Sequence, residues 1–493
     1  MSVQERKKKF LIVLFPLLFV LFSTVLNPSE ENPAIGKMLG IAVWMLGWWI
    51  TEVVPIAVTS LLPVILFPLI GISSGGEISK SYFSDVIFLY IGGFMLALAI
   101  EKWEVHRRIA TKTLMFFGQG TFQIFIGFML TTSFLSMWMA NTAIALLMLP
   151  IAISVLDELN EIYSEKELGN FRVALLVGIA FASSIGGITT LIGTPTNLVF
   201  LKIYETSFPN GPVVNFANWT IFCFPIYLML IFCAIVILYL FYKPKKSLEI
   251  IDGSFFKIAH LKLGKRTHEQ TVVLLVFALF AILMVFRADI VIGSFKIPGW
   301  SNLFANPEYI NDGVVAAFIS VVLFIIPSKN YPGNSIMDWN TALRIPWGII
   351  LLFGGGFALE KGFEISGLTL WIASQLDMLS GSHIFFIILT SSFLMLLLTE
   401  FAANVTIAQA MLPLCVAFSL TLGVNPLYLM IPMTLCASMS FILPFSTPPN
   451  AIVFATGQFS MRQMILPGLI LTIISGLIIT VMMYYWGSYV FGV

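Results

Sequence analysis

Residues 133–142 read SFLSMWMANT, and a related stretch, LLLTEFAANV, follows 263 residues later at 396–405. At this offset Asn141 aligns with Asn404, each preceded by an alanine. The alignment continues without a gap over about sixty residues. Internal repetition at a long period is a property of the whole fold rather than of a local motif. The sequence therefore predicts a chain built from two related halves.

A second pair of motifs follows the two copies. GTPTN at 193–197 corresponds to STPPN at 446–450, now at an offset of 253 residues. The offset shortens because the second half lacks ten residues of the polar loop at 157–170. Each half therefore carries one Ala-Asn motif and one Thr-Pro-x-Asn motif, both in apolar surroundings.

The composition excludes a soluble protein. Of the 493 residues, 58% are hydrophobic and 10% are charged, and the mean hydropathy is +0.96, whereas soluble domains carry about 25% charged residues. Apolar runs of about 20 residues, long enough to cross a lipid bilayer, recur along the chain. A net charge of +1 offers no basic face for nucleic acid. We expect an all-α polytopic membrane protein with the lipid bilayer as its surroundings.

The order of the apolar runs predicts about eleven transmembrane helices and two re-entrant hairpins, at 122–156 and 385–420. Basic residues at 6–9, 102–112 and 243–266 place the N-terminus and two loops in the cytoplasm by the positive-inside rule. By the same count the C-terminus is external, in the cytoplasmic membrane of the cell. The two halves then have opposite orientations, and such an inverted repeat is typical of secondary transporters.

Four breaks interrupt the apolar runs at membrane depth, namely the two hairpin tips and the two Thr-Pro motifs. The start of a helix offers unpaired N–H groups to a carboxylate, and the end of a helix offers carbonyl groups to a cation. An asparagine amide can serve both. We expect the tips at Asn141 and Asn404 to hold the two ends of one small dianion, with a cation beside each. The alternative is that both asparagines only bond neighbouring helices.

The motifs together resemble a known family, the divalent anion–sodium symporters, also called INDY-type di- and tricarboxylate transporters. The resemblance covers nearly the whole chain. It rests on the two Thr-Pro-x-Asn motifs and on WWITEVVPI at 48–56, FGGGFAL at 353–359 and TEFAAN at 399–404.

This resemblance implies a homodimer that works as an elevator, with a fixed scaffold and a mobile transport domain. Residues 1–120 would form the first-half scaffold helices, and 121–242 the first hairpin and broken helix of the transport domain. Residues 243–383 would form the cytoplasmic linker and the second-half scaffold helices. Residues 384–493 would form the second hairpin and broken helix.

The family's paired Ser-Asn-Thr motifs bind substrate carboxylates and two sodium ions, which implies roles for residues of this chain. One sodium site would use Ser136, Asn141 and the backbone near Ala140 and Gly193. The other sodium site would use Thr399, Asn404 and the backbone near Ala402 and Ser446. The substrate would contact Asn141, Thr142, Asn404, Thr447 and Pro448.

Three residues depart from the family pattern, since Ala140 and Ala403 stand in place of serines and Val405 stands in place of a threonine. The resemblance implies Na⁺-coupled symport of C4-dicarboxylates such as succinate, malate and fumarate, with 2-oxoglutarate as a further candidate. Because three hydroxyls are missing, a sodium-independent dicarboxylate exchanger (an antiporter) remains an alternative. A citrate or sulfate carrier is a more distant one.

Other classes of protein lack support in the sequence. No HExxH helix, nucleophile elbow or P-loop is present, so we expect neither an enzyme nor an enzyme cofactor. A channel would need polar faces along a continuous pore, whereas the polar residues here concentrate at the four breaks.

Charged and titratable residues near the apolar runs have their own interpretations. Glu101 and Glu364 are repeat equivalents near helix ends, where an interfacial structural role is expected. Glu400 could tune a cation site or form a local pair, and the sequence leaves both open. The histidines are expected to be solvated loop residues: His106, His260, His268 and His383.

Overall fold

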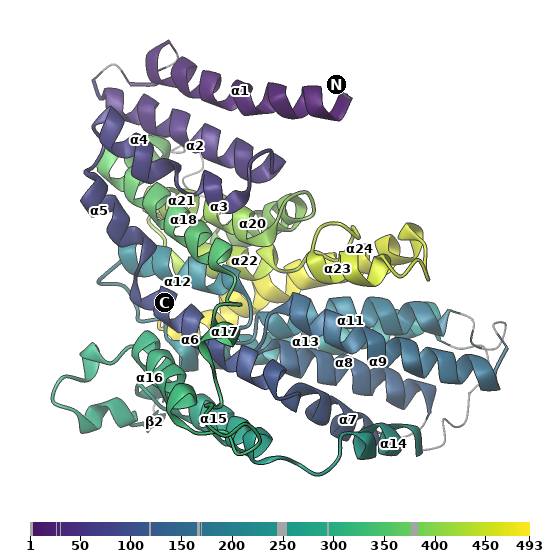
Figure 1. The fold of residues 1–493 in the computed structure, drawn as a ribbon. Helices are drawn as coiled ribbons and strands as arrows, with labels where there is room; N and C mark the ends of the chain where they lie inside the picture. Colours follow the sequence, from purple (N-terminus) through teal and green to yellow (C-terminus); the bar gives the residue numbers. More distant parts are fainter. Residues whose placement is uncertain are drawn as a thin grey trace.

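The computed structural model describes residues 3–25, 27–29, 31–117, 120–164, 168, 170–243, 254–292, 295–375 and 383–493. The regular secondary structure of this part is helical, apart from one antiparallel pair, β1 (Ile290–Ile292) and β2 (Phe295–Ile297), and one isolated bridge (Figure 1). The basic segment at 243–266 is described only in part, because residues 244–253 lie outside these ranges.

The helices of the first half follow one another along the chain. They are α1 (Val3–Thr24), α2 (Pro33–Thr51), α3 (Ile56–Thr59), α4 (Leu62–Ile70), α5 (Gly75–Ser79), α6 (Asp85–Lys102), α7 (Val105–Phe117), α8 (Thr121–Ser136), α9 (Asn141–Ile162), α11 (Phe171–Gly187), α12 (Pro195–Ser207) and α13 (Phe216–Tyr242).

The second half repeats much of this order after a connecting segment. Its helices are α14 (Ser254–Lys262), α15 (His268–Val285), α16 (Asp312–Ile325), α17 (Trp339–Ala342), α18 (Trp347–Ser366), α19 (Leu368–Gln375), α20 (Ile384–Thr399), α21 (Asn404–Leu422), α22 (Leu427–Ala437), α23 (Pro448–Phe454), α24 (Met461–Met482) and α25 (Ser488–Phe491). Short 3₁₀ turns lie at Lys80–Tyr82, Trp300–Leu303 and Pro307–Tyr309, and a π-helical turn lies at Met483–Gly487.

Seven helices in the described part are long and apolar enough to cross a membrane, and several shorter apolar helices accompany them. Short helices of 10–17 residues are what hairpin arms and interrupted spans require. The apolar run after α2 contains Pro55, Pro63 and Pro68 and is split into α3 and α4, because proline interrupts the hydrogen bonding of a helix. The expected helical polytopic membrane fold is confirmed.

The repeat found in the sequence is also a repeat of structure. Helix α8 ends at Ser136 and α20 ends at Thr399, while α9 begins at Asn141 and α21 begins at Asn404. These pairs keep the offset of 263 residues. Helices α12 and α23 begin at the prolines of the two Thr-Pro motifs, which keeps the offset of 253. Proline suits the first turn of a helix, because its missing N–H has no partner there.

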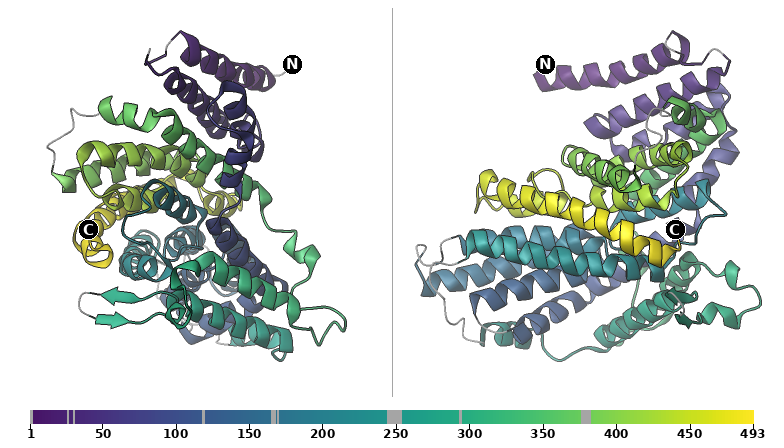
Figure 2. Two further views of the ribbon diagram at one scale, coloured as in Figure 1. Left: turned by 90° about the vertical axis from the view of Figure 1, so that its left-hand side faces the viewer. Right: turned by 180° about the vertical axis from the view of Figure 1, so that it is seen from behind.

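The two halves interlock around their breaks. Helix α12 of the first half contacts α21 and α22 of the second, and α23 of the second half contacts α9 and α11 of the first. Helix α11 is buried along nearly its whole length and packs against α8, α9 and α13 (Figure 2). Helices α1 and α2 lie side by side at the top of Figure 1, far from α15 and α16 at the bottom. The interrupted helices therefore meet in the middle of the molecule.

The expectation that the histidines are loop residues is wrong for three of them, because His106 lies in α7, His260 in α14 and His268 at the start of α15. His106 is not a solvated loop residue but lies in α7 with 4% of its surface exposed. Its Nδ1 lies 3.1 Å from the carbonyl oxygen of Ile100, and burial lowers the pKa of its imidazole. The local sequence is rich in basic residues and gives no sign of this burial, which arises because α7 packs against α8 and α14.

Candidate functional site

The tip of the first hairpin is held by a hydroxyl and an amide. Ser136 is the last residue of α8, and its Oγ lies 2.7 Å from Oδ1 of Asn141, the first residue of α9. The same Oγ lies 2.7 Å from the carbonyl oxygen of Ser183 on α11. Because α8 contacts α9 and α11, the tip is fixed against the body of the protein.

The tip of the second hairpin has the same construction. Thr399 ends α20, and its Oγ1 lies 3.0 Å from Oδ1 of Asn404, which begins α21. The same Oγ1 lies 2.5 Å from the carbonyl oxygen of Ala437 at the end of α22, so its one hydrogen is shared between two acceptors. In both tips the asparagine oxygen faces the hydroxyl five residues earlier, so each amide presents its Nδ2 group as a donor.

The asparagines of the two Thr-Pro-x-Asn motifs hold the breaks in shape. Asn197 donates from Nδ2 to the carbonyl oxygen of Thr190 at 2.8 Å. Asn450 donates from Nδ2 to the carbonyl oxygens of Ser440 at 3.0 Å and Leu443 at 3.2 Å. Backbone carbonyls freed by a helix break at membrane depth need such partners. The sequence showed the motif but gave no role to these two side chains.

Glycines let the backbone approach the first tip closely. A Cβ atom on Gly187 would lie 2.4 Å from Oδ1 of Asn141, and one on Gly193 would lie 2.4 Å from the carbonyl oxygen of Gly187. Both distances are well below a van der Waals contact, so a larger residue would displace the oxygen atoms around Asn141. The structure therefore places Gly193 beside the first tip, where its backbone was expected.

One cavity of about 510 Å³ brings the two tips together. Its lining contains Asn141 and Asn404, and three helices of 13 residues or more (α9, α12 and α21) begin at it. Among the described residues of its wall, Glu52 is the only charged side chain. An anion in this cavity would meet helix N-termini and amide donors rather than lysine or arginine.

Most of the sequence-predicted substrate and backbone residues line this cavity, but not all of the predicted cation ligands do. Those in the wall are Ala140, Asn141, Thr142, Ala402, Asn404, Ser446, Thr447 and Pro448. Ser136 and Thr399 are fully buried behind the asparagines they bond. The alanines and valine that replace family hydroxyls, Ala140, Ala403 and Val405, also face the cavity. The sites beside each tip offer hydroxyl, amide and carbonyl oxygens, the kind of ligand that hard cations prefer.

A larger cavity, of about 1060 Å³, reaches the start of α9 from another direction. Its wall contains Met139 and Ala143 next to the first tip, together with Arg107, Lys262 and Arg344. The cavity therefore extends from the first tip to residues of the basic segments.

Three glutamates near the spans, Glu101, Glu364 and Glu400, have partners in the structure. Glu101 pairs with Arg344 at 2.5 Å, and Glu364 pairs with Lys361 at 2.7 Å. These contacts fit the structural role expected of both glutamates. Glu400 instead bonds backbone N–H groups of the second break.

Two related halves whose hairpin tips and broken helices meet at one cavity define a secondary membrane transporter. The chain belongs to the family described as the sodium:sulfate symporter transmembrane region, whose model matches residues 6–493. The resemblance to the divalent anion–sodium symporters and the expectation of a transporter rather than an enzyme are thereby confirmed.

Individual relatives agree with this family. The sodium-dependent dicarboxylate transporter SdcS of Staphylococcus saprophyticus is 37% identical over 490 residues, which cover 98% of this chain and 92% of that protein. The protein of the same name from Staphylococcus aureus is 37% identical over 506 residues, which cover 100% and 95%. The YdaH transporter of Alcanivorax borkumensis has a similar fold, with a TM-score of 0.56 at 12% identity over 84% of this chain and 88% of that one.

Proposed function

We propose that this protein carries C4-dicarboxylates across the cytoplasmic membrane together with Na⁺. The observation that carries the proposal is the single cavity lined by both Ala-Asn tips. Two equivalent amide groups at one cavity suit a ligand with a carboxylate at each end, such as the C4 acids succinate, malate and fumarate, with the C5 acid 2-oxoglutarate as a further candidate. The relatives that are 37% identical along nearly the whole chain, named as sodium-dependent dicarboxylate transporters, support the same assignment.

In this proposal the two ends of the substrate are bound alike. One carboxylate accepts from the amide of Asn141 and the hydroxyl of Thr142, and the other accepts from Asn404 and Thr447, with Pro448 packed beside it. The positive ends of α9 and α21 stabilise the two negative charges. No lysine or arginine is required, which leaves the charge of the dianion to be balanced by cations that travel with it.

The cations would bind behind the tips. The first sodium site comprises Ser136, Asn141 and the backbone of Ala140 and Gly193. The second comprises Thr399, Asn404 and the backbone of Ala402 and Ser446. Because each asparagine then contacts both a cation and the substrate, binding of one favours binding of the other.

Movement of the substrate would follow the elevator scheme. The transport domain, residues 121–242 and 384–493, would move against the scaffold, residues 1–120 and 243–383. The protein would be a homodimer, with the N-terminus of each chain inside the cell and the C-terminus outside. Two polar contacts join these parts near the end of α12, where Lys202 meets Asp85 at 3.4 Å and Ser207 meets Glu360 at 2.9 Å. Further hydrogen bonds join the two parts at Phe216 and Asp312, Gln409 and Leu352, and Thr421 and Ala373. The 1060 Å³ cavity lies between the parts and is lined by Arg107 and Lys262 of the basic segments, which supports a state that is open toward the basic loops.

Sodium-independent exchange is the second candidate, because the cavity wall carries Ala140, Ala403 and Val405 where the family has hydroxyls. Radiolabelled succinate uptake into proteoliposomes separates the two functions. We expect an inward Na⁺ gradient to drive uptake into vesicles that contain no dicarboxylate. Uptake that ignores Na⁺ and requires internal succinate would instead establish exchange, and no uptake under either condition would contradict dicarboxylate transport.

A further inference from the structure

Glu400 is buried at the second tip, directly after the last residue of α20. Only 2% of its surface is exposed. Its Oε1 accepts from the backbone N–H groups of Phe441 at 2.9 Å and Ile442 at 3.0 Å, and its Oε2 accepts from that of Leu443 at 3.0 Å. All three donors lie in the break between α22 and α23. The glutamate therefore ties the hairpin tip to the broken helix.

The bonding pattern fits an ionised carboxylate. Both oxygens act as acceptors toward N–H groups, and an ionised carboxyl is the form that only accepts. Within the described part of the chain, no ion pair includes Glu400. A buried charge needs compensation, and three backbone N–H groups supply part of it. A cation nearby would supply the rest.

The bonds of Glu400 lead directly to one of the expected cation ligands. Leu443, whose N–H bonds the carboxylate, accepts through its carbonyl oxygen from the Ser446 hydroxyl at 2.7 Å and from the Ser446 N–H at 3.3 Å. On the other side, Glu400 follows Thr399, whose hydroxyl bonds Asn404. The glutamate thus orders both sides of the second site.

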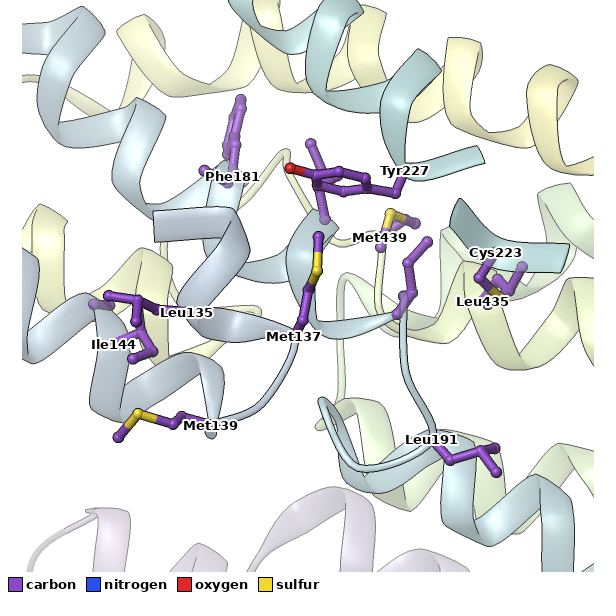
Figure 3. Close-up of a cluster of buried hydrophobic side chains, with 14 of the residues drawn as sticks. Leu135, Met137, Met139, Ile144, Phe181, Leu191, Cys223, Tyr227, Leu435 and Met439 are labelled. Carbon is purple, nitrogen blue, oxygen red and sulfur yellow. The ribbon is translucent and has the colours of Figure 1, made fainter. Parts of the chain in front are cut away.

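The first half has no such group. Met137 is the repeat equivalent of Glu400, and it points into a cluster of apolar side chains that includes Phe181, Tyr227 and Met439 (Figure 3). There the break is tied to the tip by a neutral bond, from the Thr190 hydroxyl to the Met137 carbonyl oxygen at 2.5 Å. The two tips are alike in their asparagines and unlike in charge.

We propose that Glu400 positions the second cation site and supplies its negative charge, so that this site binds Na⁺ more tightly than the first and fills before it. This inference rests on the proposed function. Charged groups that hold and orient the ligands of a bound cation raise its affinity. The site beside Asn141 would then take its cation at higher Na⁺ concentration.

The test is Glu400→Gln, which removes the charge and keeps the size of the side chain. We expect the Na⁺ concentration for half-maximal succinate uptake to rise at least fivefold, while the KM for succinate at saturating Na⁺ changes less than twofold. Glu364→Gln, at a side chain that is 57% exposed, should leave both unchanged. An unaltered Na⁺ requirement in Glu400→Gln, or equal shifts in both constants, would overturn the inference. Failure of the proposed function would give a different result, because succinate uptake by the unaltered protein would then not depend on Na⁺.

A second measurement retains Glu400 and so does not depend on the folding of that variant. Sodium without substrate should raise the melting temperature of the purified protein relative to choline. We expect Thr399→Ala to abolish this rise at low Na⁺ concentration and Ser136→Ala to retain it. Equal losses in the two variants would contradict unequal sites, and loss only in Ser136→Ala would contradict the order of filling proposed here.

Discussion

At the scale of single residues, the geometry of each tip depends on a contact between a hydroxyl and the amide oxygen of an asparagine, at 2.7 Å in the first tip and 3.0 Å in the second. Ser136 and Thr399 fix the orientation of the Asn141 and Asn404 amides. The surrounding backbone leaves little room for adjustment, because Gly187 lies against Asn141. In the proposed site, binding of substrate by these amides would require small residues at positions that do not line the cavity, such as Gly187.

Gly187→Ala tests this requirement. The added Cβ would lie 2.4 Å from Oδ1 of Asn141, so the amide must move, and we expect succinate uptake to fall at least tenfold. The matched control is Gly76→Ala on α5, where an added Cβ meets nothing within 4 Å. Initial uptake rates at equal protein per vesicle are the measurement. Normal uptake by Gly187→Ala would show that Asn141 need not be held as described.

Some residue roles could be predicted from sequence and others could not. Asn141 and Asn404 stood out because they are repeated at a fixed offset, and the structure brings both to one cavity. The bonds of Asn197, Asn450 and Glu400 could not be foreseen. Their partners are backbone groups in a break, and the position of a break in space depends on packing between the two halves.

At the scale of elements, helix starts were the most predictable feature. Proline at the first position of α12 and α23 and the abrupt polar tips fixed four helix boundaries. The burial of His106 in α7 was missed, because a basic amphipathic segment looks solvated until its neighbours are known. Short helices outside the repeat, such as α17, also left no periodic pattern to recognise.

Asp338 is the N-cap residue of α17. Its carboxylate accepts from the backbone N–H of Thr341 at 2.9 Å and pairs with Lys102 of α6 at 2.7 Å. The hydrogen bond from Lys102 is the main reason that the pKa of Asp338 falls to about 2. The contribution of the Asp338 carboxylate to the free energy of unfolding is therefore fully present above the usual pKa of an aspartate, about 4. This contribution is lost as the pH falls from there toward 2.

Asp338→Ala should lower the free energy of unfolding by about 1–2 kcal/mol, from the loss of a helix cap and a partly exposed ion pair. Melting of the purified protein in detergent, followed by tryptophan fluorescence, is the measurement. Glu104→Ala removes an exposed pair with Arg107 and should change the melting temperature little. Equal melting temperatures for Asp338→Ala and the unaltered protein would contradict the role given to this cap.

At the scale of the whole molecule, the elevator proposal divides the chain into a scaffold and a transport domain, and each of these contains segments from both halves. A Cβ on Gly93 of α6 would lie 3.4 Å from Cβ of Ile192, in the break between α11 and α12. This separation is close to that of a disulfide. The elevator proposal assigns Gly93 to the fixed scaffold and Ile192 to the mobile transport domain, so a covalent link between them should stop transport.

The cross-link is tested in a variant that lacks the four native cysteines, which are free in the structure. Oxidised Gly93→Cys/Ile192→Cys should lose uptake and recover it on reduction. The control pair is Ala57→Cys/Gly348→Cys, where the corresponding distance is 3.6 Å and both residues belong to the proposed scaffold. Uptake by fully cross-linked Gly93→Cys/Ile192→Cys at the rate of the control would rule out the elevator division drawn here.

The central claim is that the two tips form one substrate site, and equilibrium binding of radiolabelled succinate to the purified protein tests it most directly. Binding would be measured in Na⁺ and in choline for the unaltered protein, Asn141→Ala and Asn404→Ala, with melting temperatures to confirm that each variant is folded. We predict Na⁺-dependent binding by the unaltered protein and its loss in both variants. Near-normal binding by either folded variant would show that the tips do not act as one site.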